Sequence, residues 1–389
     1  MKEGYRLLGD IIRQVDVRNT DGKEENLLGV SVQKMFIPSI ANTVGTDFTK
    51  YKVVKRGQFT YIPDTSRRGD KIGIALLTDY DEGLVSNIYT VFEVKDENEL
   101  LPEYLMLWFS RPEFDRYARF KSHGSVREIM DWDEMCKVEL PVPSIDKQRS
   151  IVKAYQTITE RIELKRRIND NLEATAQAVF QEQFASFYGA DELPDGYRII
   201  NLDNLCTVKG GKRLPADCKL LDTPTDHPYI RVRDVGSNRY VCLTNQFQYI
   251  DEETYSAISR YIVNTGDIVI SIVGTIGLLG KIHSSLDKAN LTENCVKLAN
   301  IHTVTSDYLY YTLCYKKQIK EIDLLTVGAV QAKLPMYNIQ SMKILVPPTK
   351  AIEAFQRKMN VLNEQIEANT VEIQKLYELE EVLLAKLSD

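Results

Sequence analysis

The sequence is poor in the residues that build metal and disulfide centres. Its 389 residues include four histidines, none at the spacing of a zinc site. The six cysteines form no CxxC pair, which excludes a regular disulfide framework and favours reduced, packed thiols. The longest apolar run, Ile268 to Gly280, has 13 residues and three glycines, too short to span a bilayer as a helix. Because the N-terminus has no signal-peptide pattern, we expect a cytoplasmic protein. The histidine spacing predicts that it binds no metal.

Motifs for nucleotides and methyl donors are also missing. The nearest phosphate-loop candidate, Gly274 to Lys281, has five residues between its outer glycines instead of four, and Ile282 stands where Ser or Thr must ligate Mg²⁺. These residues are typical of two strands joined by a turn. There is no GxGxxG or GxSxG motif. The methyltransferase tetrad of Asn or Asp, Pro, Pro and Tyr or Phe is missing as well, since Val346 to Thr349 fails at both ends. We therefore expect no catalysis and no cofactor bound by the chain itself.

No long segment is strongly basic. Residues 1–143 hold 20 basic and 24 acidic residues, and residues 144–187 hold 7 and 6. Residues 188–347 hold 17 of each, and residues 348–389 hold 5 and 8. Charge alone therefore does not indicate a nucleic-acid binder. If DNA is the ligand, the basic side chains must cluster in space or a partner must supply positive charge.

The second half of the sequence repeats the first with an offset of 204 residues. Tyr104 then matches Tyr308, Pro143 matches Pro347, and Gly124-Ser-Val matches Gly328-Ala-Val. The offset is the same in globular and helical segments, which is hard to obtain by chance. Each repeat predicts a mixed domain of about 140 residues that ends at a proline-marked exit and continues into a long helix. The expected strands lie at 27–32, 59–62, 72–77, 88–94, 229–232, 246–250, 268–273 and 295–301, and the expected shorter helices at 102–110, 112–120 and 307–315.

Both long helices carry an apolar seam at alternating steps of four and three. The seam comprises Ile151, Ile158, Ile162, Leu172, Val179, Phe355, Met359, Leu362, Ile366, Ile373, Leu376 and Leu383. Lys165, Asn169, Asn369 and Glu380 interrupt it as polar residues. This pattern favours two helices that pair with each other, although each could instead lie on its own domain.

We predict an α+β fold of two similar mixed α/β domains, joined by two long antiparallel coiled-coil helices and related by a pseudo-two-fold internal repeat. The predicted boundaries are 1–143 for the first domain and 144–187 for the central helix. The second domain follows at 188–347, and the C-terminal helix at 348–389.

An ordered series of motifs in repeat two resembles a known family. Pro228-Tyr-Ile-Arg-Val-Arg-Asp, Gly266-Asp-Ile-Val-Ile-Ser-Ile-Val-Gly-Thr-Ile-Gly, Ala289-Asn-Leu-Thr-Glu-Asn and Gly328-Ala-Val-Gln-Ala-Lys precede Met342-Lys-Ile-Leu-Val-Pro-Pro. Repeat one carries a looser copy, in which Asp64-Thr-Ser-Arg-Arg-Gly replaces the Gly-Thr-Ile-Gly turn. The series resembles a target-recognition domain of the specificity subunits of type I restriction–modification enzymes.

The resemblance implies a non-catalytic subunit with two target-recognition domains, each reading one half of a bipartite, asymmetric DNA site. The helices would fix the spacing of the half-sites and dock two modification subunits. Those subunits bring S-adenosylmethionine and methylate adenine, and restriction subunits with ATP-driven translocation and nuclease activity would join them. Two alternatives stay open: a coiled-coil adaptor without enzymatic activity, and a stand-alone DNA-modifying enzyme with unrecognised motifs.

Base readout requires Arg, Lys, Asn or Gln side chains presented on loops, whereas phosphate contacts position the protein. The candidates for DNA contact in domain one are Arg67, Arg68, Lys71, Ser125 and Arg127. In domain two they are Lys209, Lys212, Arg213, Arg231, Arg233, Arg239, Lys281, Gln331 and Lys333. Lys209, Lys212 and Arg213 surround Gly210-Gly211 in a basic turn suited to phosphates. Strand periodicity predicts that Arg231 and Arg233 share one face.

Overall fold

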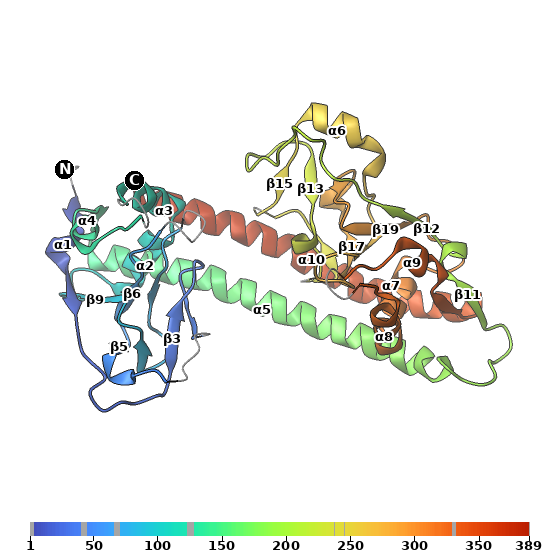
Figure 1. Ribbon diagram of the computed structural model, residues 1–389, viewed down its shortest axis with the longest axis horizontal. Helices are drawn as coiled ribbons and strands as arrows, with labels where there is room; N and C mark the ends of the chain where they lie inside the picture. Colours follow the sequence, from blue (N-terminus) through green and yellow to red (C-terminus); the bar gives the residue numbers. More distant parts are fainter. Residues whose placement is uncertain are drawn as a thin grey trace. The chain divides into compact units, whose positions relative to one another are not determined.

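The computed structural model describes residues 4–39, 45–65, 71–122, 128–236, 238–244, 246–328 and 332–388 (Figure 1). The chain forms two compact units. Unit one contains Met1–Leu164 with Lys375–Asp389, and unit two contains Lys165–Gln374. The long helices α5 (Ile145–Phe184) and α10 (Thr349–Ala385) begin within two residues of the boundaries predicted from the sequence. Each compact unit nevertheless includes a segment of both helices, because both segments pack on its core.

Unit one holds two four-stranded sheets and a two-stranded one. The first sheet has the order β2-β9-β6-β7, and the second has the order β4-β3-β8-β5. The bounds are β1 Tyr5–Leu7, β2 Ile12–Val15, β3 Leu27–Val30, β4 Phe36–Pro38, β5 Lys52–Lys55, β6 Phe59–Tyr61, β7 Ile74–Leu76, β8 Glu82–Val85, β9 Thr90–Val94 and β10 Glu139–Pro141. The shorter helices are α1 Leu8–Ile11, α2 Pro102–Ser110, α3 Pro112–Lys121 and α4 Trp132–Cys136, with a 3-10 turn at Phe48–Lys50.

Unit two holds a five-stranded sheet of order β12-β19-β16-β17-β14, a three-stranded sheet of order β15-β13-β18, and the pair β11-β20. The bounds are β11 Arg198–Asn201, β12 Thr207–Gly210, β13 Pro228–Ile230, β14 Tyr240–Val241, β15 Gln248–Tyr249, β16 Ile268–Ser271, β17 Leu279–Ile282, β18 Asn290–Leu291, β19 Cys295–Ala299 and β20 Lys343–Val346. The shorter helices are α6 Glu252–Ile258, α7 Ser306–Cys314, α8 Lys316–Leu325 and α9 Met336–Ser341. Short 3-10 helices occupy Ala185–Phe187, Leu202–Asn204, Val232–Asp234, Ser259–Tyr261, Ser284–Leu286 and Lys386–Ser388.

The internal repeat is visible in strand order and in single hydrogen bonds. The order β2-β9-β6-β7 of unit one recurs as β12-β19-β16-β17 in unit two, and the parallel pair β3-β8 recurs as β13-β18. The buried Tyr104 donates its hydroxyl hydrogen to the carbonyl oxygen of Pro141 at 3.2 Å. Tyr308 makes the same bond to Leu345 at 2.7 Å. Donor and acceptor are both displaced by 204 residues, which confirms the repeat found in the sequence.

All eight expected strands are present, and each is shorter than predicted. The helices expected at 102–110 and 307–315 are α2 and α7, correct to within one residue. The strand expected at 229–232 ends at Ile230, and Val232–Asp234 turns into a 3-10 helix. Strands β16 and β17 are antiparallel around Gly274 and Gly277, whose φ angles of +83° and +82° only glycine adopts without strain. The glycine-rich segment is therefore a strand-turn-strand, as predicted.

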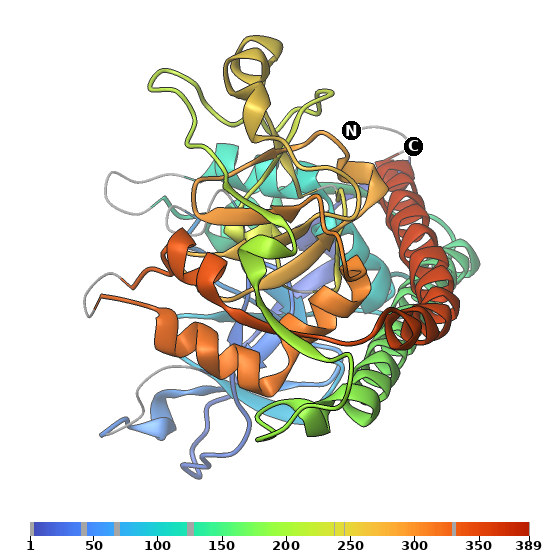
Figure 2. The ribbon, with the colours of Figure 1, turned by 90° about the vertical axis from the view of Figure 1, so that its right-hand side faces the viewer.

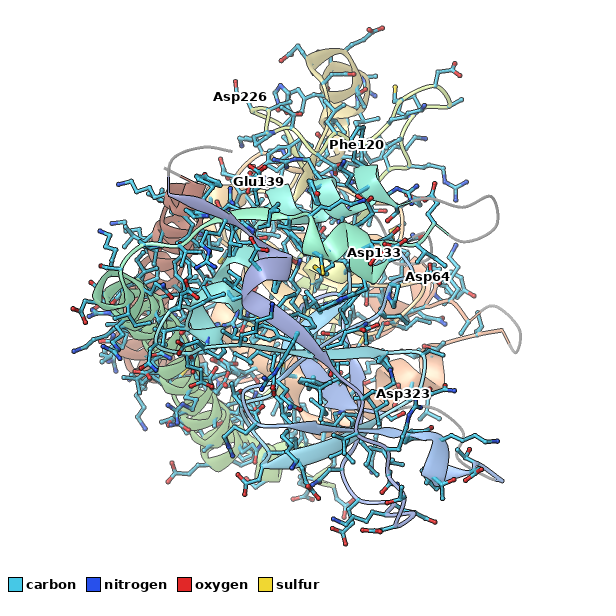
Figure 3. The ribbon with its side chains drawn as sticks, turned by 90° about the vertical axis from the view of Figure 1, so that its left-hand side faces the viewer. Asp64, Phe120, Asp133, Glu139, Asp226 and Asp323 are labelled. Carbon is cyan, nitrogen blue, oxygen red and sulfur yellow. The ribbon has the colours of Figure 1, made fainter. Side chains whose placement is uncertain are left out.

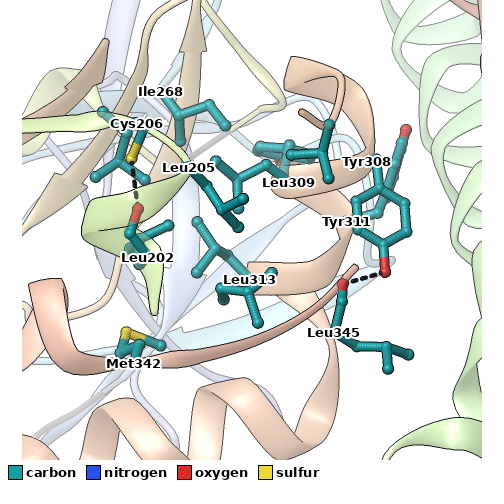
Figure 4. Close-up of a cluster of buried hydrophobic side chains, with 14 of the residues drawn as sticks. Leu202, Leu205, Cys206, Ile268, Tyr308, Leu309, Tyr311, Leu313, Met342 and Leu345 are labelled. Carbon is teal, nitrogen blue, oxygen red and sulfur yellow. Dashed lines mark hydrogen bonds between the residues drawn. The ribbon is translucent and has the colours of Figure 1, made fainter. Parts of the chain in front are cut away.

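In unit two the helices α5 and α10 pair with each other and also join the domain core (Figure 2). Lys165 Nζ donates to Asn369 Oδ1 at 2.9 Å, and the rings of Phe180 and Phe355 lie 6.0 Å apart. The residue number rises along one helix as it falls along the other, so the pairing is antiparallel, as predicted. Figure 4 shows part of the core that α5 and α10 join, including the hydrogen bond from Tyr308 to Leu345.

In unit one, residues of α5 and α10 also pack in or against the domain core. Val152 of α5 belongs to its core, and Ile151, Tyr155 and Leu384 pack against that core. All twelve residues of the predicted seam are buried or partly buried. The helices therefore pair with each other, as predicted, and they also lie on the domain cores, which was the alternative. Among the described residues, no helix combines the length and the apolar composition needed to cross a membrane.

Candidate nucleic-acid interface

One backbone bridge recurs in both domains, and it joins the segments that carry several of the predicted DNA contacts. In unit one Asp64 pairs with Ile129, and Thr65 N donates to the carbonyl oxygen of Glu128 at 2.9 Å. In unit two Val273 pairs with Lys333. Ile129 and Lys333 are equivalent under the offset of 204 residues. Each domain therefore holds the ends of two candidate loops together.

Seven of the candidates for DNA contact are Lys333 itself or lie within seven residues of Asp64, Ile129 or Lys333 in the sequence, and the structure describes Lys71 and Lys333 among them. Arg67, Arg68, Ser125, Arg127 and Gln331 lie outside the described residues. Lys71 is exposed, and the next residue, Ile72, donates its N–H to Asp115 Oδ1 at 3.2 Å. Lys333 is exposed as well, and its backbone pairs with Val327 besides Val273. Figure 3 shows Asp64, which marks the anchor in unit one.

Each unit also exposes a large apolar side chain near the end of one of its shorter helices. Phe120, near the end of α3, is 80% exposed, and Leu324, near the end of α8, is 84% exposed (Figure 3 labels Phe120). They are equivalent under the same offset of 204 residues. The sequence repeat could have revealed this pair, but composition and periodicity gave no reason to select them. Such side chains can pack against a thymine methyl group in the major groove.

The basic turn of domain two is rigid, with its charges outside. A Cβ atom on Gly211 would lie 2.0 Å from the carbonyl oxygen of Thr292, so only glycine fits. Lys212 N donates to the carbonyl oxygen of Leu291 at 2.8 Å, which fixes the turn against β18. Lys209, Lys212 and Arg213 are all exposed. Arg213 Nε reaches Glu293 Oε1 at 2.7 Å, yet the side chain is 80% exposed. Three exposed cations on a fixed turn suit contacts to phosphate oxygens.

Arg231 and Arg233 do not share a strand face, so that prediction was wrong. Asp234 accepts a hydrogen bond from the backbone N–H of Arg231 at 2.8 Å and closes a 3-10 turn after β13. The same carboxylate binds Arg231 Nε at 3.1 Å, and the arginine side chain is only 15% exposed. Arg233 is 63% exposed. Arg233 therefore stays a candidate for DNA contact, whereas Arg231 has a structural partner.

Arg239 and Lys281, both predicted to contact DNA, take part instead in a buried ionic network. The Arg239 side chain is 2% exposed and that of Lys281 is 14% exposed, and both bind Asp307 Oδ1. Burial works against the charged carboxylate, but Lys281 and Arg239 lower the pKa of Asp307 to about 2. A guanidinium enclosed in this way is not presented to a DNA surface, so we remove Arg239 from the candidates. Lys281 is removed for the same reason.

The sequence analysis missed the polar partners of this network. Gln356 and Asn363 of α10 both donate to Asp307 Oδ2, at 2.6 and 2.7 Å. Their spacing of seven residues places them on one face of a helix, which is a signal that the sequence contains. Asp307 lies in the first turn of α7, where a carboxylate is common for other reasons. The sequence therefore gave no reason to connect it with α10.

Comparison with known proteins accounts for the repeated architecture. A sequence model of the family described as type I restriction modification DNA specificity domain matches residues 11–174 and again residues 194–382. The chain belongs to this family. The two matches cover most of both repeats, and each extends into a long helix.

Named relatives agree with this assignment. The specificity subunit of the type I restriction enzyme HindI from Haemophilus influenzae is 21% identical, over 98% of this chain and 97% of its own. The specificity subunit of MjaIX from Methanocaldococcus jannaschii is 22% identical, over 74% of this chain and 68% of its own. The crystal structure of a type I restriction–modification S subunit from M. genitalium covers 99% of this chain and 96% of its own, with a TM-score of 0.53 and 15% identity. At that identity the structural likeness concerns the fold alone.

Proposed function

We propose that this protein is the DNA-recognition subunit of a cytoplasmic type I restriction–modification complex, and that it has no catalytic activity of its own. Each domain reads one half of a bipartite, asymmetric site. The paired helices set the distance between the half-sites and dock two modification subunits, and restriction subunits complete the assembly. The observation that carries this proposal is the double match of the specificity-domain family to two repeats of one fold.

The recurring bridge supports the assignment of a similar role to both domains. Asp64–Ile129 and Val273–Lys333 hold equivalent loop pairs, while the residues on those loops differ between the domains. Two domains that read different bases need the same backbone bridge to hold their loops and different side chains on those loops. Base specificity depends on the donors and acceptors presented to the groove, not on the frame that presents them.

Domain exchange tests the recognition role. Residues 197–343 are replaced by the second domain of another family member, and the complex is assembled with its modification subunits. Sequencing of methylated bases should show one half of the site changed and the other half intact. A change in both halves, or in neither, would contradict the assignment of one half-site to each domain.

Calorimetry tests the proposed absence of catalysis. The purified chain, titrated separately with S-adenosylmethionine and with ATP, should show no binding at micromolar concentrations. Binding of either compound to the chain alone would contradict the division of labour. The complete modification complex serves as the control, because its modification subunits should bind S-adenosylmethionine.

A further inference from the structure

A buried carboxylate joins the second domain to the C-terminal long helix, α10. Asp307 of α7 binds Arg239 and accepts a hydrogen bond from Lys281 Nζ of β17 at 2.7 Å. On its other oxygen it accepts hydrogen bonds from Gln356 and Asn363 of α10. The Asp307 side chain is 4% exposed. One carboxylate therefore bonds at once to residues of its own domain and to a long helix.

The arginine of the network bonds to both sides in the same way. Arg239 Nη1 donates to Tyr311 Oη at 2.9 Å and to Asn363 Oδ1 of α10 at 2.5 Å. Tyr311 in turn donates to Glu173 Oε2 of α5 at 2.9 Å. The guanidinium carbon of Arg239 also lies 5.0 Å from the ring centre of Tyr311 and 5.2 Å from that of Tyr240, distances typical of cation–π contacts. Both helices are thus bonded to one arginine–carboxylate pair.

Domain one attaches to its helix segments without this network. Under the offset of 204 residues, Val152 and Thr159 replace Gln356 and Asn363, and Leu107 replaces Tyr311. Val152 and Leu107 belong to the apolar core of unit one. Apolar contact is not directional, whereas hydrogen bonds to a charged group fix both distance and angle. The first domain has hydrogen bonds of its own to α5, since Gln148 Nε2 donates to the carbonyl oxygen of Glu99 and Gln148 Oε1 accepts from Leu101 N, both at 2.8 Å, but these partners are uncharged. The second domain therefore has bonds to a buried ion pair that these positions of the first domain lack.

We propose that Asp307 and Arg239 are positioning residues that fix the orientation of the second recognition domain on the helix pair, and so fix the distance along DNA at which its half-site is read. This inference rests on the proposed function. Rotation of the domain on the helices would move its DNA-reading loops along the duplex. A network that prevents such rotation makes the complex strict about the number of base pairs between the half-sites.

The test removes the bonds from α10 and keeps the ionic cluster inside the domain. The variant Gln356→Ala/Asn363→Ala loses three hydrogen bonds to Asp307 and Arg239 but leaves the contacts among Arg239, Asp307 and Lys281. The matched control, Lys358→Ala/Glu364→Ala, changes two exposed residues of the same helix. A second variant, Arg239→Lys, keeps the charge and loses the guanidinium fork, in which Nη2 binds Asp307 while Nη1 binds Tyr311 and Asn363.

The full chain is assembled with its modification subunits, and the recognised site is first found by sequencing methylated bases. Initial methylation rates are then measured on duplexes whose spacer is native, one base pair longer or one base pair shorter. The preference for the native spacer should fall by about tenfold in both variants, because hydrogen bonds to a charged group are lost. The control should keep the preference of the unaltered protein, and the bases read in each half should not change.

Three outcomes would overturn the positioning role. The preference for the native spacer could stay unchanged in both variants, or all rates could fall by one common factor, as for simple destabilisation. The recognised bases could also change, which would place the network in base readout. Failure of the proposed function is distinguishable from all three, since the unaltered protein would then give no methylation at any bipartite site.

Discussion

The seam of the helix pair makes a prediction about a fragment that contains only the first repeat. A chain of residues 1–190 keeps the first domain and α5 but loses α10. The lost segment near Leu376 and Leu383 is equivalent, under the offset of 204 residues, to the segment near Leu172 and Val179 of α5. A second copy of the fragment can therefore supply similar apolar residues. An exposed apolar stripe of that length favours pairing, so we expect a two-fold dimer.

One polar residue should weaken that dimer. Lys165 and Asn369 are equivalent under the offset and bond to each other in the intact chain at 2.9 Å. Lys165 Nζ also lies 2.8 Å from Glu372 Oε2, with 20% of its side chain exposed. In a dimer of the fragment, Lys165 would instead meet its own copy and have no Glu372. Two like charges about 4 Å apart repel by up to ~4 kcal/mol at an effective dielectric constant near 20, and by ~1–2 kcal/mol once partial solvent exposure screens them.

The substitution Lys165→Asn in the fragment should therefore tighten the dimer by about tenfold. Sedimentation equilibrium at several concentrations measures the dissociation constant of each fragment. Lys153→Asn, an exposed position on the same helix, is the control and should leave the dissociation constant unchanged. A well-folded monomer at micromolar concentration would contradict antiparallel pairing as the organising contact. Equal dissociation constants with and without Lys165 would show that this residue does not disfavour self-pairing. With modification subunits, the dimer should recognise a palindrome of the first half-site, because protein symmetry imposes site symmetry.

Three further predictions concern unit two. Gly211→Ala should lower the melting temperature clearly, because its Cβ would meet the carbonyl oxygen of Thr292, whereas Gly210→Ala, with open space around it, should cost no more than ~1 kcal/mol of stability. Because the pKa of Asp307 is about 2 in the folded chain and the ordinary value is 3.8, its ionised form stabilises the fold above pH ~4. That contribution to the free energy of unfolding, about 2–2.5 kcal/mol, should be lost as the pH falls toward 2. Urea unfolding at several pH values should therefore show a smaller loss of stability in acid for Asp307→Asn than for the unaltered chain. Arg213→Ala should weaken DNA binding by the assembled complex similarly on all sequences and reduce the salt slope by about 1, and Lys288→Ala, at another exposed cation, is the comparison.

The sequence predicted the parts of the fold that depend on periodicity and repetition. Helices α2 and α7 matched within one residue because proline or a capping threonine marks their first turn. The repeat located the paired helices and the equivalence of the domains. The sequence did not separate Arg231 from Arg233, since the 3-10 turn after β13 depends on a local bond to Asp234. Strand periodicity considers only the alternation of side chains, so it does not predict a turn that depends on a side-chain bond to the backbone.

The candidate site was predicted less well for a physical reason. Exposed cations on turns, such as Lys212 and Arg213, follow from the glycines beside them. The positions of Arg239 and Lys281 depend on a carboxylate in α7 and on amides in α10, which are distant in the sequence. A basic residue next to a turn has the same local signature whether it faces DNA or a buried aspartate. Only long-range packing decides between the two.

The two repeats share one structural feature near the candidate DNA contacts and differ in how each domain is attached to the long helices. The bridge Asp64–Ile129 and its counterpart Val273–Lys333 give both repeats the same connection between the segments that carry the candidate DNA contacts. The attachment to the helices differs, since Val152 and Thr159 of the first repeat stand where Gln356 and Asn363 of the second bind Asp307. Under the proposed function, changes in these segments would alter the bases read and leave the bridge intact. Changes at Gln356 or Asn363 would alter how the second domain is held on α10, so we expect base readout and domain orientation to vary independently in one chain.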